Sequence, residues 1–328
     1  MKKRIYLFSK GVLKREGNTL CLVTDKGKKF VPVKDVAEIH MFGEVRFNSR
    51  LLEFLTINKI TLHVYNHFGY YMGSYYPRRH YNSGFMTLKQ AQHYLDGERR
   101  ADLARRFVRG SGGNMLKNLK YYENRVGGLS DVIGDIESLL LEAETVGRAE
   151  ELLGIEGNMK KSYYRAFNVI LKKEGFTFTG REKRPPRNRI NALISFGNSL
   201  LYSTVLNQIY HTHLDPRIGF LHTTNSRKFS LNLDVADVFK PILVDRVIFK
   251  LVNKGMISER DFREEMGGIL LNDKGRRTFA QEFESRLNTT IKLGGRHFSY
   301  TRVIRLELYK IEKHLMEEKE YEPFVSRW

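Results

Sequence analysis

Residues 75–96, YYPRRHYNSGFMTLKQAQHYLD, contain the change of sequence pattern that decides the fold. Before this stretch, short apolar runs are separated by glycine-containing turns, which is typical of β-strands. After Thr87, apolar residues recur three and four positions apart, as in amphipathic helices, and they do so to the end of the chain. We therefore predict an α+β protein with two domains. These are an N-terminal β-rich, β-sandwich-like domain over residues 1–85 and a larger C-terminal all-α domain over residues 86–328, with a linker at 78–85.

The same patterns predict the individual elements. In the first domain we expect strands at 3–8, 19–23, 29–32, 38–40 and 61–65 and one helix at 50–57. In the second domain we expect helices at 88–96, 98–109, 114–125, 129–145, 148–173, 188–212, 235–253, 278–287 and 301–319.

The composition indicates a polyanionic partner. Apolar residues make up 41% and charged residues 28% of the 328 residues, as in an ordinary soluble globular protein. The formal net charge is +19. Because each neutralised phosphate releases counterions, nucleic acid is the expected partner, although an anionic membrane or solubility alone would also account for the excess. Between Lys160 and Arg189 there are ten basic and two acidic residues, and Pro185 and Pro186 predict a rigid basic loop there.

Two further features limit the class of protein. The single cysteine, Cys21, excludes an intramolecular disulfide and any zinc site built from cysteines. Residues 190–214 contain no charged side chain, yet Asn, Ser and Gln recur through them. We therefore expect a helix buried in the protein rather than a membrane span. The apolar run after the N-terminus ends at Ser9, which is too short for a signal peptide, so we expect a cytoplasmic protein.

Three local patterns are candidates for carrying chemistry. Glu156 precedes Gly157 in an expected helix, where a missing side chain lets a ligand or another backbone approach. His222 follows an apolar pair after a turn. Asp234 and Asp237 are three residues apart on an expected helix, so their carboxylates lie on one face. Each pattern has a plainer alternative: a surface glutamate, a hydrogen-bonded structural histidine and, for Asp234, a helix cap.

Taken together, these side chains form a set of ligands that is mostly oxygen. One imidazole with two or three carboxylates suits Mg²⁺ or Mn²⁺ better than Zn²⁺. An ion held in this way polarises a phosphodiester and stabilises the charge on its attacking or leaving oxygen. The sequence lacks the phosphate-binding loop of NTPases and the G-x-S-x-G motif of serine hydrolases.

In this order along the chain, the motifs resemble the CRISPR-associated spacer-acquisition integrase family, the universal CRISPR adaptation nuclease. The resemblance rests on Glu156-Gly157, on residues 184–195, on residues 215–222 and on residues 230–237, and residues 300–305 fit it as well. It implies that Glu156, His222 and Asp237 bind Mg²⁺ or Mn²⁺ and that Asp234 supports the catalytic site. The residues we then expect at the DNA are Lys240, Arg165, Arg184, Arg187 and Tyr163.

The resemblance also implies a reaction and an assembly. In the reaction, a DNA 3′-hydroxyl attacks a phosphodiester of a repeat array, so that a captured fragment becomes a spacer. Attack by water makes the same site a nuclease. In the assembly, homodimers form through the N-terminal domain, and two of them join a small ferredoxin-like partner protein in a heterohexamer.

Several alternatives stay open. His222 could carry a proton instead of binding the metal. The chain could also be a non-catalytic DNA-binding scaffold of the same fold, or an integrase of a mobile element. We expect residues 110–113, Gly-Ser-Gly-Gly, to interrupt a helix. Many members of the family continue this helix with a basic, apolar stretch, so we assign no DNA contacts at these residues.

Overall fold

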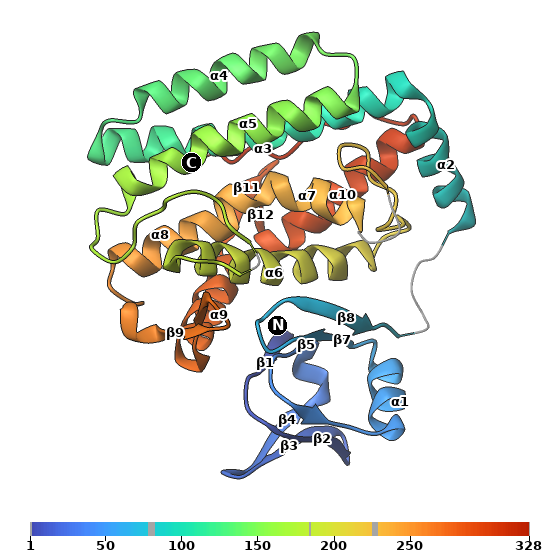
Figure 1. The fold of residues 1–328 in the computed structure, drawn as a ribbon. Helices are drawn as coiled ribbons and strands as arrows, with labels where there is room; N and C mark the ends of the chain where they lie inside the picture. Colours follow the sequence, from blue (N-terminus) through green and yellow to red (C-terminus); the bar gives the residue numbers. More distant parts are fainter. Residues whose placement is uncertain (1, 78–82, 184, 225–228, 328) are drawn as a thin grey trace. The chain divides into compact units, whose positions relative to one another are not determined.

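The computed structural model describes residues 2–77, 83–183, 185–224 and 229–327. It divides into two compact units, Met1–His80 and Tyr81–Trp328, and we describe each by itself (Figure 1). A strand-rich unit precedes a helical one, which confirms the predicted fold class. Residues 78–82 of the expected linker lie outside the described residues. Its last residues are helical, because α2 (Gly84–Leu95) begins directly after its N-cap Ser83.

The N-terminal unit contains two four-stranded sheets and one helix. The first sheet has the order β1 (Lys3–Leu7), β5 (Val36–Met41), β7 (Thr61–Tyr65), β8 (Tyr71–Tyr75). The second has the order β4 (Gly27–Pro32), β3 (Thr19–Thr24), β2 (Gly11–Glu16), β6 (Val45–Arg46). Apolar side chains from both sheets and from α1 (Ser49–Asn58) form one core. β2, β6 and β8 were not predicted, because β2 and β6 carry charged residues and β8 lies in a Gly/Tyr-rich stretch that reads as a turn.

The opposite face of the first sheet carries a buried polar cluster. Residues alternate between the two faces of a strand, so Arg4, Glu38, His40 and His63 lie together on the face away from that core. Arg4 forms an ion pair with Glu38, and Nε2 of His63 lies 3.3 Å from the Glu38 carboxylate. Burial opposes ionisation of Glu38, but Arg4 and the histidines outweigh burial and hold its pKa well below the usual range. Burial lowers the pKa of His40 to about 4.

The helical unit is built around a long central helix. This helix, α3 (Gly97–Val126), packs against α4 (Ser130–Thr145), α5 (Ala149–Ile170) and α7 (Ser230–Lys240) (Figure 1). On the other side of α7 lie α6 (Arg189–Ile209) and α10 (Tyr300–Leu315), which also contact each other. A π-helical segment (Pro241–Asp245) joins α7 to α8 (Arg246–Asn253), and α9 (Asp273–Asn288) packs against α8 and α10.

The prediction that residues 110–113 interrupt a helix is wrong. The helix α3 runs through them without a break, because the glycines allow close packing on either side. A Cβ atom on Gly110 would lie 2.7 Å from Pro323, and one on Gly112 would lie 2.7 Å from Leu140. No side chain larger than that of glycine therefore fits at these two positions.

Two short hairpins interrupt the unit that we predicted to be all helical. They are β9 (Phe262–Glu265) with β10 (Gly268–Leu271), and β11 (Thr290–Leu293) with β12 (Arg296–Ser299). Four-residue strands are too short for their alternation to stand out from a helical background. Residues with positive φ form both turns, Met266 and Gly267 in the first and Gly294 and Gly295 in the second.

The uncharged stretch 190–214 forms the buried helix that we expected. Most side chains of α6 are buried, and several of its polar groups form hydrogen bonds within the protein. Thr204 donates to the carbonyl of Leu200, for example, and Asn191 accepts from Arg181 and donates to the carbonyl of Gly180. Among the described residues, no helix is long and apolar enough to cross a membrane.

The buried cluster in the first sheet predicts that acid destabilises the protein. The pKa of His40 is depressed by folding, so its contribution to stability is complete above pH 6.5 and is lost as the pH falls toward 4. Glu38 remains ionised over this range. We expect the change from pH 7 to pH 5 to cost wild type about 2 kcal/mol more than it costs His40→Gln, measured by calorimetric unfolding of the full chain. Equal losses in the two proteins would contradict this assignment.

Candidate metal and nucleic-acid site

Two helices bring four charged side chains to one point. The helix α5 carries Glu156 and, one turn later, Lys160, while α7 carries Asp237 and Lys240. Residues three or four apart share a helix face, so each carboxylate has a lysine of its own helix beside it. Glu156 is 3% exposed and Asp237 is 2% exposed. Since a buried carboxylate must be compensated, this arrangement requires cations.

The lysines supply that compensation in the structure. The Lys160 ammonium forms an ion pair with Glu156 and also donates to Oδ2 of Asp237 at 3.0 Å, so it bridges the two carboxylates. Lys240 pairs with the other oxygen of Asp237. Burial raises the pKa of Glu156 against the effect of Lys160. Burial also opposes ionisation of Asp237, but the two lysines and His222 outweigh burial and hold its pKa below the usual range.

The third predicted ligand, His222, is held by Asp234. Nδ1 of His222 lies 2.8 Å from Oδ1 of Asp234, and the Asp234 carboxylate also accepts the backbone N–H groups of Phe220, Leu221 and His222. Asp234 lies in the second turn of α7 and is fully buried, so it does not cap that helix. Instead it fixes the loop that carries His222. This corrects the alternative of a helix cap.

The hydrogen bond to Asp234 sets the chemistry of the imidazole. An Nδ1–H that donates to Asp234 leaves the lone pair of Nε2 free, and Nε2 lies 3.7 Å from Oδ2 of Asp237. Burial opposes the charged form of His222, but Asp234 and Asp237 outweigh burial and raise its pKa. His222 and Asp237 therefore face one another directly, whereas the Lys160 ammonium lies between Asp237 and Glu156.

A basic cavity opens beside these carboxylates. It has a volume of about 530 Å³ and is lined by six cationic side chains with aromatic rings among them. The cations are Lys160, Lys161, Arg165, Arg181, Lys183 and Lys240, and the rings are Tyr164, Phe178 and Tyr202. The Lys240 ammonium lies 4.8 Å from the centre of the Tyr202 ring. Phosphates together with unstacked bases are the ligands that suit this combination.

The residues predicted to contact DNA lie in different environments. Lys240 and Arg165 line the basic cavity, and Arg187 is exposed on the loop between α5 and α6. Arg184 lies outside the described residues. Tyr163 is 1% exposed and accepts a hydrogen bond from Asn118 in the interior. We do not retain it as a DNA contact, because its ring faces the core.

The charged residues near the site that sequence reasoning missed include Lys160 and Asp245. Lys160 follows Glu156 by four positions, a spacing that brings the two together on a helix but is common on solvated helix faces. Asp245 is buried in the π-helical segment, and burial raises its pKa to about 7. No local pattern predicts this environment, because it depends on how α7 and α8 are joined.

A second possible metal-binding cluster lies in the N-terminal unit. The ligand atoms of Glu38, His40 and His63 all lie within 4.8 Å of one another, the only such group found among the described residues. However, Arg4 already balances the charge of Glu38. A divalent ion there would add two uncompensated positive charges in a buried position, which is costly.

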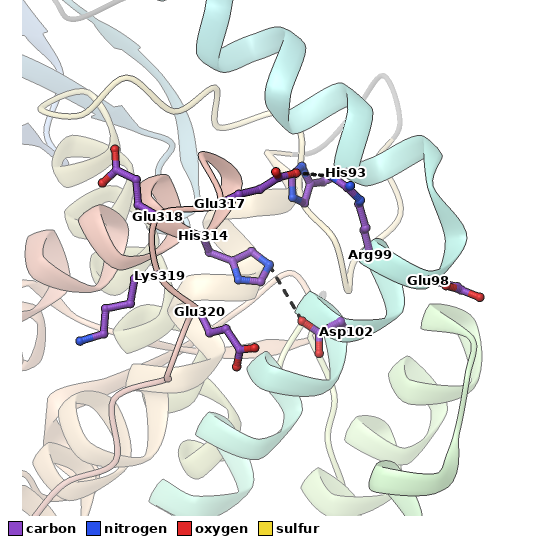
Figure 2. Close-up of a pocket in the computed structure, with 9 residues that line it drawn as sticks. All are labelled: His93, Glu98, Arg99, Asp102, His314, Glu317, Glu318, Lys319 and Glu320. Carbon is purple, nitrogen blue, oxygen red and sulfur yellow. Dashed lines mark hydrogen bonds and ion pairs between the residues drawn. The ribbon is translucent and has the colours of Figure 1, made fainter.

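A further hollow, of about 630 Å³, lies where α10 ends near the start of α3 (Figure 2). His93 and His314 face it together with several carboxylates (Figure 2). Nδ1 of His314 accepts the N–H of Tyr321, so in neutral His314 the hydrogen is on Nε2, which points toward Asp102 at 3.9 Å. That nitrogen has no lone pair to offer a metal. His314 is therefore a poor metal ligand in this hollow.

Comparison with known proteins gives a consistent family. Residues 5–285 match the family model described as CRISPR associated protein Cas1. The chain is 54% identical, over the full length of both proteins, to a CRISPR-associated endonuclease Cas1 of Thermodesulfovibrio yellowstonii. It is 46% identical to a Cas1 protein of Thermotoga maritima whose structure is known, with a TM-score of 0.88 and coverage of 97% of this chain and 98% of that one.

Two structures with lower sequence identity share the fold. One is a casposase bound to an integration product, 21% identical with a TM-score of 0.88, and the match covers 100% of this chain and 95% of that one. The other is a Cas6-RT-Cas1–Cas2 complex, 19% identical with a TM-score of 0.85, and the match covers 100% of this chain and 36% of that one.

The loop that carries His222 depends on Gly219. A Cβ atom at this position would lie 2.5 Å from the backbone of Ser230 and 2.7 Å from Oδ2 of Asp234. We expect Gly219→Ala to lower the free energy of unfolding by about 1–3 kcal/mol, measured by urea denaturation, because α7 cannot yield to the added methyl group. As a control, Gly154→Ala on α5, where a Cβ atom would have nothing within 4 Å, should be neutral or stabilising. Equal effects of the two substitutions would contradict this account.

Proposed function

We propose that this chain, which belongs to the CRISPR-associated Cas1 family, is a metal-dependent DNA nuclease-integrase that inserts captured fragments into a repeat array. One observation carries the proposal: beside a cavity lined by six cations, the buried carboxylates of Glu156 and Asp237 share the Lys160 ammonium, and the imidazole of His222 faces Asp237. The relatives' name, CRISPR-associated endonuclease, agrees with phosphodiester chemistry.

Glu156, His222 and Asp237 would hold one Mg²⁺ or Mn²⁺. Two buried carboxylates and an imidazole whose Nε2 lone pair faces Asp237 suit such an ion. The Lys160 ammonium, between the two carboxylates, shows that this position favours positive charge. When bound, the metal supplies a Lewis acid for the phosphodiester. We prefer this set to Glu38, His40 and His63, because Arg4 already neutralises Glu38.

The residues of the chain would then position the DNA. Lys240 and Lys160 would attract a phosphate to the cavity that they line, and the aromatic rings of the same cavity would accept unstacked bases. A 3′-hydroxyl of the fragment forms a new P–O bond as the bond to the 3′-oxygen of the repeat strand breaks, and that oxygen takes a proton from solvent and leaves as a hydroxyl. The hydroxyl proton passes to solvent or, if His222 is not a ligand, to its Nε2, while Asp234 holds the ring in place.

The family also suggests the partners. We propose that the chain binds double-stranded fragments and the repeat, forms a homodimer through its N-terminal domain, and joins a small ferredoxin-like protein in a heterohexamer. A Cas1–Cas2 complex with the same fold supports a partner of this kind. The second candidate, integration of a mobile element, rests on the casposase that shares the fold. An assay that compares repeat targets with the ends of an element separates the two.

Removal of a ligand should abolish strand transfer while DNA binding remains. We expect Asp237→Asn and His222→Ala to lower joining of a labelled duplex to supercoiled plasmid at least about a hundredfold, since even outer-shell partners of a metal are worth 10- to 100-fold. EDTA should stop wild type, and His213→Ala, at an exposed histidine, should react normally. If both ligand variants join DNA normally, or wild type does not join DNA even with its partner, the chain is a scaffold.

The basic cavity should be the part of the site that recognises DNA. Gly157 lies at its edge, and a Cβ atom there would have nothing within 4 Å, so a larger side chain would fill the opening without disturbing the fold. We expect Gly157→Leu to weaken binding of a duplex with single-stranded ends about tenfold by fluorescence anisotropy, roughly the loss of one stacked base. Gly154→Leu, about one turn away on the same helix and also with open space, is the matched control. Equal affinities would show that DNA does not enter the cavity.

A further inference from the structure

The end of the chain crosses the central helix. We call residues 321–327 the C-terminal strap. Pro323 and Val325 of the strap lie against Gly110 and Gly113 of α3, where Cβ atoms would be 2.7 Å and 3.0 Å from them. The strap is also fixed to α10, because buried Glu307 accepts the Tyr321 hydroxyl and the N–H of Phe324, both at 2.7 Å. The small residues of α3 thus form a seat for the strap.

One buried side chain joins the strap to the helix of the metal site. Asn114, on α3 beside that seat, donates from Nδ2 to the carbonyl of Val238 at 2.8 Å and to the carbonyl of Phe324 at 2.9 Å. Its Oδ1 accepts the N–H of Ser326 at 2.9 Å. One fully buried amide therefore connects α3, α7 and the strap.

A second asparagine, one turn along α3, makes the next contact. Asn118 donates to the carbonyl of Pro241 and, at 3.0 Å, to the hydroxyl of Tyr163 on α5. It is also fully buried. The two asparagines, four residues apart on α3, thus bond two backbone carbonyls three residues apart, Val238 in the last turn of α7 and Pro241 directly after that helix.

These carbonyls lie where the helix changes its hydrogen-bond pattern. Pro241 has no N–H to continue the ladder, and the segment Pro241–Asp245 is π-helical. The carbonyl of Asp237, four residues earlier, thus loses its ordinary helical donor, and the bonds from Asn114 and Asn118 hold the backbone on either side of this interruption. Val238 directly follows Asp237, and Pro241 directly follows Lys240, so the two asparagines hold the backbone next to both charged residues of α7.

We infer that Asn114 and Asn118 are positioning residues for the metal site and that the strap completes the hydrogen bonds of Asn114. They touch neither metal nor DNA and act by fixing the backbone on which Asp237 and Lys240 stand. The inference rests on the proposed function, because it takes the α7 carboxylate as a metal ligand.

The test compares Asn114→Ala and Asn118→Ala with a variant of matched stability. Ile136→Ala or Ile136→Val opens a cavity under α4, which provides no residue of the site, and serves to match the loss of unfolding temperature. Two quantities are measured in the full chain at temperatures where every variant is folded. These are hydrogen-exchange protection of peptides covering α7, and the dissociation constant for Mn²⁺.

We expect both asparagine variants to lose protection in α7 and to bind Mn²⁺ about tenfold more weakly, while the matched variant keeps both properties. Unchanged α7 protection, or lost protection with unchanged Mn²⁺ affinity, would overturn the inference. If Asp237 is not a metal ligand and the proposed function is wrong, the result is different: Asp237→Asn binds Mn²⁺ as tightly as wild type does.

Discussion

The helical unit depends on keeping two carboxylates, Glu156 and Asp237, buried close together. Like charges in a poorly hydrated place repel one another and lose the stabilisation of water, so positive charge must come between them. In the structure the Lys160 ammonium does this from α5, and Lys240 supports it from α7. A divalent cation would satisfy the same requirement with more charge. The lysines would then be free to turn toward phosphate in the cavity that they already line.

Other parts of the helical unit hold these charged side chains in position. The loop segment that carries His222 is held by Asp234, which accepts three backbone N–H groups and orients the imidazole. Gly219 lets that loop lie directly on α7. Asn114 of α3 holds the last turn of α7 at the carbonyl of Val238, and Asn118 holds the carbonyl of Pro241 directly after it. The site thus stands on packed helices and a loop with satisfied hydrogen bonds, which is the preorganisation that a metal site requires.

Much of this could be predicted from the sequence, because strong local signals carry it. The change of periodicity near Thr87 predicted the two kinds of fold, and the order of the Glu-Gly, His and Asp motifs predicted the family. Contacts between distant parts of the chain could not be predicted. Gly110 looked like a helix breaker because the strap that packs on it lies more than two hundred residues away. The resemblance placed Tyr163 at the DNA, whereas its ring is buried and its hydroxyl accepts a hydrogen bond from Asn118 of another helix.

The central claim is that His222 binds the catalytic metal together with Asp237. Electron spin-echo spectroscopy of Mn²⁺ bound to the full chain tests it directly, since a coordinated imidazole adds modulation from its ¹⁴N nucleus. The account predicts this modulation in wild type, its loss in His222→Gln, and its persistence when His40 and His63 are both replaced by Gln. Modulation that survives His222→Gln but disappears with His40 and His63 would contradict the claim and place the metal in the N-terminal sheet.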